Sequence, residues 1–306
     1  MKIVFAGTTA QAAAVLNHLH KTQHTVVAVL TREDAPVGRK AIVTPSAVAH
    51  LAKELDLPII KANRITDEVV SQLGEFEPEL GVVIAYGSLL KATALAVPHH
   101  GWINLHFSLL PKWRGAAPVQ HSLLTGDQIT GVTIFRLDEG MDTGPLLTAV
   151  PTEVLPDENA GELLNRLTLI GISALDESLA RIEAGIAVFE PQTGAATLAG
   201  KLQRGEAKID WSVKADNINN LVRAMNPEPI AWTTYGDSTM RVLSSRPAQH
   251  ISVLPPGTVF MDNNQSYVTC GSQSVLQLLQ VQPAGKNVMS ATDWLRGQNG
   301  SVILGG

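Results

Sequence analysis

The stretch KIVFAGTTAQAAAVLNHLHKTQHTVVAVL (residues 2–30) decides the fold class. KIVFA (2–6) and TVVAVL (25–30) are short apolar runs without polar alternation, which is typical of strands buried on both faces. Between them, AAAVLNHLH (12–20) has the apolar spacing of a helix. A buried strand, a helix and a second buried strand predict a parallel sheet with crossover helices.

The same alternation continues through the next part of the chain. We expect helices at 45–55 and 66–73, and strands at 57–60, 80–85, 102–107, 131–137 and 146–150. Asn159 is followed by Glu162, a pattern that predicts a capping box at the start of a long helix from about residue 160 to 184. Residues 1–188 are therefore expected to form an α/β domain with a Rossmann-like, mostly parallel sheet.

The composition and the apolar pattern of the sequence change after residue 188. Residues 189–206 are rich in Pro, Gly and Thr without a sustained period, and we interpret them as a linker. Residues 207–306 contain one helical segment and several short strand-like runs separated by turn residues. This pattern predicts a small C-terminal β-barrel, of which an OB-like barrel is one candidate.

Composition excludes several classes of protein. Across 306 residues the net charge is −5, which argues against a protein that coats nucleic acid indiscriminately. The single cysteine, Cys270, excludes an internal disulfide and fits a reducing cytoplasm. The first apolar run is too short for a signal peptide, and no run is long enough to cross a membrane. The histidines lack the spacing of metal ligands, so we expect no metal site. Together with the single cysteine and the short apolar runs, these features predict a cytoplasmic protein that does not enter a membrane.

Asn104 and His106 interrupt the apolar strand 102–107. Residues two apart in a strand face the same way, so the amide and the imidazole point together. They lie at the end of the strand, where open α/β sheets bind ligands. Two such groups suit the stabilisation of a negative oxygen at a carbonyl under attack. A structural hydrogen-bonding pair is the alternative, and on these two residues alone it is favoured.

Asp142 lies in GMDTG (140–144), where the glycines allow a tight turn. An Asx-turn is the ordinary interpretation of such an Asp. However, this loop follows the strand 131–137, and the loops after successive parallel strands open on the same edge. Asp142 is therefore expected to meet His106 and to favour the charged, donating form of the imidazole. No Ser or Cys is a compelling nucleophile, so the substrate must supply its own.

The motifs N-x-H, SLLP and RGAAP, with D-x-G downstream, resemble the signature of the folate-dependent formyltransferases. The stretches KIDWSVKADNINNLVRAMNPEP, PPGTVF and LQVQPAGKNVMSATDWLRG resemble the second domain of the members that act on tRNA. The resemblance implies transfer of a formyl group from 10-formyltetrahydrofolate to the α-amine of methionine on initiator methionyl-tRNA. It further implies that Asn104 and His106 bind the oxyanion, that Asp142 assists proton transfer, and that the protein is a monomer.

The resemblance also assigns binding residues. The turn Ser108, Leu109, Leu110 and Pro111 corresponds to the family's folate-binding turn, and Tyr86 and Gly87 border the same pocket, with a structural role for Tyr86 equally open. In the loop 31–45, Arg39 matches a key tRNA-binding arginine and Lys40 is a nearby cation. An ordinary solvated loop is the alternative. Four further cations in the C-terminal part are available for contacts with phosphates: Lys208, Lys214, Arg223 and Lys286.

The chain departs from the family pattern at Phe107, in the first loop GTTAQAA and in the cation-poor stretch VGRKAIV. The last departure suggests weaker tRNA binding. Another formyl-folate enzyme, such as a glycinamide ribonucleotide formyltransferase or a formyltetrahydrofolate hydrolase, is the enzymatic alternative. A folate- or RNA-binding module without catalysis is the non-enzymatic one, and intact Asn104, His106 and Asp142 argue against it. A dinucleotide-dependent dehydrogenase is disfavoured because AGTTAQA is not a G-x-G-x-x-G motif.

Overall fold

The computed structural model describes residues 1–38, 40–298 and 300–305, and within it the chain forms two compact units. The first unit comprises Met1–Pro118, Thr130–Thr152 and Leu164–Ala199. The second comprises Val119–Ile129, Glu153–Leu163 and Gly200–Gly306. The division of the sequence at residues 188 and 206 stays a prediction.

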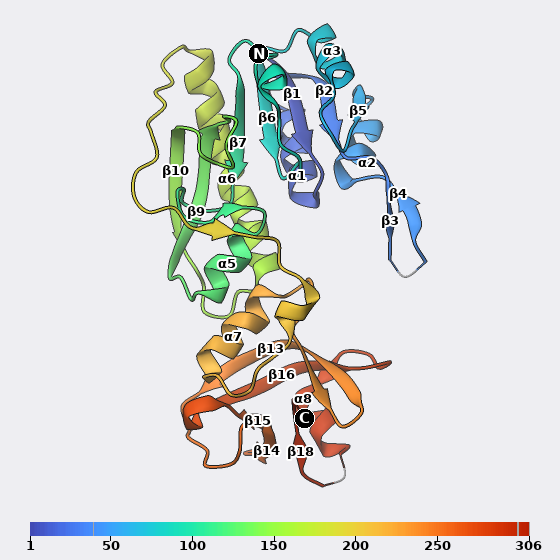
Figure 1. The fold of residues 1–306 in the computed structure, drawn as a ribbon, viewed down its shortest axis with the longest axis vertical. Helices are drawn as coiled ribbons and strands as arrows, with labels where there is room; N and C mark the ends of the chain where they lie inside the picture. Colours follow the sequence, from blue (N-terminus) through green and yellow to red (C-terminus); the bar gives the residue numbers. More distant parts are fainter. Residues whose placement is uncertain (39, 299, 306) are drawn as a thin grey trace. The chain divides into compact units, whose positions relative to one another are not determined.

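The first unit is built on a seven-stranded sheet, drawn from blue to green in Figure 1. In spatial order its strands are β10 (Leu146–Glu153), β9 (Ile129–Arg136), β7 (Trp102–His106), β6 (Leu80–Ile84), β1 (Lys2–Gly7), β2 (Thr25–Thr31) and β5 (Ile59–Lys61). Pairing is parallel from β7 through β6, β1 and β2 to β5. The unalternated apolar runs are buried, as β6 illustrates along its whole length. The expectation of a mostly parallel, Rossmann-like sheet is confirmed.

One strand runs against the others. β9 pairs with β7 in the antiparallel direction, with Ile103 opposite Arg136 and His106 opposite Thr133. The expectation that the loop after β9 opens on the same edge as the loop after β7 was therefore wrong. The apolar pattern of β9 indicates that both of its faces are buried. A parallel and an antiparallel strand can both be buried in this way, so the pattern does not predict the direction.

Helices cover both faces of this sheet. The helices are α1 (Ala10–Leu19), α2 (Ala47–Glu54), α3 (Asp67–Glu75), α4 (Ala92–Leu95) and α6 (Ala160–Glu183), whereas α5 (Pro118–Leu124) belongs to the second unit from Val119 onward. The side-chain hydroxyl of Thr66 caps α3, accepting from the Val69 N–H at 3.4 Å. Before α6, Asn159 Oδ1 accepts from the Glu162 N–H at 3.0 Å and Glu162 Oε2 accepts from the Asn159 N–H at 2.9 Å. The predicted capping box is confirmed.

Two short strand pairs complete the first unit. The loop after β2 forms a hairpin of β3 (Ala35–Val37) and β4 (Ile42–Thr44), which projects from the sheet in Figure 1. β8 (Arg114–Gly115) pairs in parallel with β11 (Leu198–Ala199). The second pair ties the chain before α5 to the last residues of the unit.

The second unit is an antiparallel sheet that nearly closes into a barrel, confirming the expected C-terminal β-barrel. Its main strands follow the order β12 (Trp232–Tyr235), β13 (Ser238–Ala248), β16 (Val275–Pro283), β15 (Gln265–Thr269), β14 (Thr258–Asp262) and β18 (Val302–Ile303), with β17 (Met289–Ser290) beside β16. The remaining elements are η1 (Arg204–Ala207), α7 (Ala215–Ala224), η2 (Gly271–Gln273) and α8 (Ala291–Arg296). The barrel's core includes the fully buried Met240, Val242 and Val268.

Among the described residues, no helix combines the length and apolar character needed to span a membrane.

Candidate active site

Asn104 and His106 lie on one face of β7, at its C-terminal end. Trp102 shares this face by the alternation of side chains and donates its indole N–H to the Ala94 carbonyl of α4 at 2.8 Å. The opposite face is occupied by α6, since a Cβ on Gly171 would lie 2.7 Å from Leu105 Cδ2. The Oδ1 atom of Asn104 is buried and has no hydrogen-bond partner within the described part of the chain. A buried amide oxygen without a partner is costly, which marks this atom as one that a ligand would satisfy.

His106 is buried, with 5% of its surface exposed, and both ring nitrogens face polar groups. Nε2 lies 2.9 Å from the Trp113 carbonyl, and because a carbonyl only accepts, Nε2 carries a proton. Nδ1 lies 3.8 Å from Asp142 Oδ2. Burial lowers the pKa of His106, outweighing Asp142 and the Trp113 carbonyl, which act in the opposite direction. The Asp142 carboxylate thus acts in the direction expected from the sequence, favouring the charged form, but burial has the larger effect on the pKa of His106.

Asp142 reaches His106 by a route that the sequence did not predict. The loop 137–145 leaves β9 beside the start of β7, where the Leu137 N–H donates to the Trp102 carbonyl at 2.9 Å. It then folds back along the face that carries Asn104 and His106. Near its end Gly144 passes so close to the backbone of β9 that a Cβ would lie 1.8 Å from the Arg136 oxygen. Only glycine fits there, and this close return brings the Asp142 carboxylate to the imidazole.

The Asp142 side chain is held as well as placed. Oδ2 accepts from the Gly115 N–H at 2.7 Å, so the carboxylate ties its loop to β8. The backbone of Asp142 has φ +53°, in the left-handed region that favours glycine. A residue kept in that region needs support from its surroundings.

The turn Ser108, Leu109, Leu110 and Pro111 follows directly after His106 and is fixed from within. The Ser108 hydroxyl donates to the Lys112 carbonyl at 2.5 Å. Thr133 on β9 accepts from the Leu110 N–H at 3.2 Å and donates to the Ser108 carbonyl at 2.7 Å. The turn is therefore preorganised beside His106, with several of its backbone groups already used inside the chain.

Tyr86 and Gly87 follow β6, the neighbour of β7. The Tyr86 side chain is 1% exposed, and its hydroxyl donates to the Ala62 carbonyl at 2.7 Å. Burial raises the pKa of Tyr86 to about 12. The geometry thus favours the structural alternative for the Tyr86 side chain. Gly87 has φ +82°, and its carbonyl accepts from Arg32 Nη1 at 2.7 Å.

Residues 189–199, interpreted from the sequence as part of a linker, contact the site directly. Gln192 Nε2 donates to the carbonyls of Asp142 and Gly144, each at 2.8 Å. Thr197 accepts from the Trp113 N–H through its hydroxyl at 2.9 Å. The sequence analysis missed Gln192 and Thr197 because an irregular Pro, Gly and Thr-rich segment carries no periodic signal.

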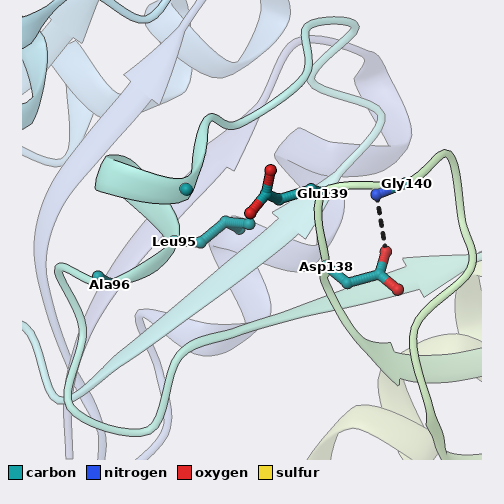
Figure 2. A pocket seen from close by; sticks show the side chains of 6 residues that line it. Leu95, Ala96, Asp138, Glu139 and Gly140 are labelled. Carbon is teal, nitrogen blue, oxygen red and sulfur yellow. Dashed lines mark hydrogen bonds between the residues drawn. The ribbon is translucent and has the colours of Figure 1, made fainter.

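An open hollow lies between α4 and the Asp142 loop, lined by Ala92, Leu95, Ala96, Asp138, Glu139 and Gly140. Figure 2 shows Leu95 and Glu139 extending toward it from opposite sides. Asp138 Oδ1 accepts from the Gly140 N–H at 3.0 Å and from the Thr143 hydroxyl at 2.7 Å, which shapes the wall of the hollow. The hollow has both apolar and carboxylate groups within reach of a ligand.

Of the two cations expected in the loop 31–45, Arg39 lies outside the described residues. Lys40 is exposed. The hairpin beside it also exposes apolar side chains, with Ile42 61% and Val43 64% exposed. An exposed hairpin carrying a cation is available to a macromolecular substrate.

In the second unit, the four cations named in the sequence analysis have different environments. Lys208 Nζ and the Arg204 guanidinium each lie 5.7 Å from the ring of Trp232. Arg241 lies opposite Trp232 on the neighbouring strand, and its Nη1 donates to Gln282 Oε1 at 3.2 Å. Cations around an aromatic ring suit a phosphate backbone and a stacked base.

Arg223 has a different environment. Its Nε donates to the Glu158 carbonyl at 2.8 Å and its Nη2 to the Leu155 carbonyl at 2.7 Å. This guanidinium therefore anchors the segment before α6. Lys214 and Lys286 are exposed.

Comparison with known families follows the same two parts of the chain. A family model described as formyl transferase matches residues 1–179, and one described as formyl transferase, C-terminal domain, matches residues 201–299. The chain belongs to the formyl transferase family. The resemblance drawn from N-x-H, SLLP and D-x-G is confirmed.

Relatives in the formyl transferase family match nearly the whole length of the chain. A methionyl-tRNA formyltransferase of Arthrobacter sp. (strain FB24) is 46% identical over 97% of both chains. One from Leifsonia xyli subsp. xyli (strain CTCB07) is 44% identical over 99% of this chain and 100% of its own length.

Solved formyl transferases share the fold at lower identity. WlaRD, a sugar 3N-formyl transferase solved with dTDP and 5-N-formyl-THF, has a TM-score of 0.66 at 18% identity, covering 94% of this chain and 99% of its own. Phosphoribosylglycinamide formyltransferase from Bacillus halodurans has a TM-score of 0.51 at 21% identity, covering 60% of this chain and 95% of its own. At these identities the likeness shows the fold alone.

Proposed function

We propose that the protein transfers the formyl group of 10-formyltetrahydrofolate to the α-amino group of methionine on initiator methionyl-tRNA, for use in translation initiation. The observation that carries the proposal is the placement of the Asp142 carboxylate 3.8 Å from the His106 imidazole, beside the unpartnered Asn104 amide oxygen. Near-full-length relatives named methionyl-tRNA formyltransferase support the choice of acceptor.

The chemistry needs no nucleophile from the protein. The methionine amine attacks the formyl carbon, forming a C–N bond and placing negative charge on the formyl oxygen. The bond between that carbon and N10 of the folate then breaks. One proton leaves the amine and one reaches N10, so tetrahydrofolate and the formylated amine are the products.

Asn104 and His106 are placed to stabilise the negative oxygen. The Asn104 amide can donate through Nδ2 while its buried Oδ1 accepts a hydrogen bond from the attacking amine. His106 offers the N–H of Nε2, which in this structure donates to the Trp113 carbonyl. We propose that this N–H turns to the oxyanion when substrates bind, since catalytic hydrogen bonds often form only in the complex. Each such donor is worth about 10²–10³-fold in rate.

Asp142 serves both His106 and the amine. Its charge opposes the effect of burial on the imidazole and so supports donation as the oxyanion develops. We propose that the carboxylate also takes the amine's proton, directly or through water. The bond from Gly115 leaves the other carboxylate oxygen for this task.

For the co-substrate, we propose that Ser108, Leu109, Leu110, Pro111 and Gly87 border the bound folate. The unpartnered buried oxygen of Asn104 is an acceptor that the attacking amine would satisfy, which supports a site for the reacting groups at this end of β7. The hollow between α4 and the Asp142 loop is lined by none of these residues, so it is not assigned to the folate. Tyr86 contributes by holding the segment after β6 in place.

For the tRNA, we propose that Arg39 and Lys40 contact the acceptor end, and that Lys208, Arg204 and Arg241 contact phosphates on the second unit. Phosphate contacts set the position of a nucleic acid without reading its sequence. We further propose that the protein acts as a cytoplasmic monomer, which sedimentation and fractionation would test.

The proposal is tested by giving the purified protein 10-formyltetrahydrofolate labelled in the formyl group, with and without methionyl initiator tRNA. We expect the label on the methionine. Label released only as formate would instead support a hydrolase. Label on glycinamide ribonucleotide but not on methionine would support the purine-pathway reaction. The solved phosphoribosylglycinamide formyltransferase covers 60% of this chain.

A further inference from the structure

The strap, defined as residues 189–199, crosses the active site of the first unit. Its Thr197 N–H donates to the Pro111 carbonyl at 3.3 Å, at the end of the turn that follows His106. Leu198 and Ala199 pair with β8, whose Gly115 holds the Asp142 carboxylate. The strap therefore contacts the segments on both sides of the site.

Gln192, within the strap, joins the Asp142 loop to β8 through its side chain. Its Nε2 donates to the carbonyls of Asp142 and Gly144, each at 2.8 Å. Its Oε1 accepts from Arg114 on β8, at 2.6 Å from Nη2 and 3.2 Å from Nε. One amide thus links the loop of Asp142 to the strand that the Asp142 carboxylate contacts.

The orientation of this amide is fixed by its partners. Carbonyl oxygens only accept, so they must face the NH₂ group, and a guanidinium only donates, so it must face the oxygen. The reverse orientation would set two acceptors against an acceptor and donors against donors. Gln192 is therefore matched to its place by chemistry as well as by length.

We propose that Gln192 is a positioning residue for formyl transfer: by bonding the Asp142 loop to Arg114, it keeps the Asp142 carboxylate facing His106. This inference rests on the proposed function. The loop needs such a support because Asp142 has φ +53°, a conformation that a non-glycine residue leaves when its surroundings allow. Without the two bonds from Gln192, the Gly115 N–H remains as the hydrogen bond described for the carboxylate.

Two substitutions separate the parts of this amide. Gln192→Met keeps the length of the side chain and removes its polar atoms. Gln192→Glu keeps an acceptor for Arg114 but replaces the donors with an oxygen that repels the carbonyls of Asp142 and Gly144. Thr193→Ala, at the exposed next residue of the strap, is the matched control.

We expect both Gln192 variants to lower kcat by about tenfold to a hundredfold, since a displacement of about 1 Å of a reacting group costs up to about 100-fold. The KM for formyl-folate is expected to change by less than about twofold. Thr193→Ala is expected to match the wild type. A kcat within about twofold of wild type in Gln192→Glu would overturn the proposal.

A readout that does not depend on turnover is the titration of the His106 imidazole, followed by NMR with labelled histidine and assigned with a His106→Gln variant. Asp142 raises the pKa of His106 against the larger effect of burial. If Gln192 holds Asp142 in place, both variants should lower the pKa of His106 further. An unchanged titration in folded variants would refute the positioning role. If the wild type transfers no formyl group, the proposed function fails while this titration still decides the role of Gln192.

Discussion

Replacing Asp142 with Asn tests the charge of the site while keeping its shape. The Asn oxygen can still accept from the Gly115 N–H, so the loop is expected to remain in place. What disappears is the interaction between the carboxylate and an imidazole 3.8 Å away, with side chains only 6% and 15% exposed for His106 and Asp142. At this separation and an effective dielectric constant of about 20, that interaction is about 4 kcal/mol in the charged state.

Only part of that energy is expected in turnover, because burial of the imidazole opposes its charged form. We expect kcat for the formylation of methionyl-tRNA to fall by at least about 100-fold, equivalent to about 2.7 kcal/mol of lost transition-state stabilisation. Formyl-folate binding, measured by fluorescence titration, and the melting temperature should change little. Glu139→Gln, an exposed carboxylate in the same loop, is the control and should keep normal turnover. Near-normal turnover in Asp142→Asn would remove Asp142 from its role.

Three further predictions concern other parts of the protein. Tyr86→Phe removes the hydrogen bond to the Ala62 carbonyl and should lower the free energy of unfolding by about 1 kcal/mol, with unchanged kcat. A lower kcat in the folded variant would show that Tyr86 has a direct role in the reaction. His106 has a lowered pKa in the folded state, so the unfolded chain binds more protons and stability falls as pH drops from about 6.5 toward that lower pKa. Urea unfolding should show the wild type losing more stability than His106→Gln on acidification over this range, and parallel losses would contradict the assignment. Arg39→Ala should raise the KM for methionyl-tRNA but leave folate affinity unchanged, a defect that a free methionyl ester as acceptor should hide; equal losses with both acceptors would contradict the assignment.

The sequence predicted those features that depend on local burial and local capping. Unalternated apolar runs identified β1, β2 and β6 because a strand covered on both faces has no need of polar residues. Asn159 and Glu162 predicted the start of α6 because their hydrogen bonds lie within one turn of helix. The pairing of Asn104 with His106 followed from the two-residue repeat of a strand.

The direction of β9 could not be predicted in the same way. A strand buried on both faces has the same composition in either direction, and the chain between His106 and Ile129 is long enough for either connection. Asp142 meets His106 because its loop folds back along the sheet, which depends on the close approach of Gly144 to β9. The sequence shows the glycines of GMDTG, but it does not show that the backbone of β9 lies against Gly144.

The environment of single side chains was also beyond the sequence. The balance between burial and the Asp142 charge at His106 depends on how completely the loops cover the ring. Gln192 lies in an irregular segment, and its importance comes from partners that are distant along the chain. Such contacts have no periodicity that a sequence could display.

The most direct test is a crystal structure of the protein with a stable formyl-folate analogue and a methionyl acceptor-stem mimic. The account predicts the formyl oxygen about 3 Å from a nitrogen of Asn104 and from Nε2 of His106, with the methionine amine on the side of Asp142. A formyl group bound away from these three side chains, with Asn104 Oδ1 still unpartnered, would contradict it.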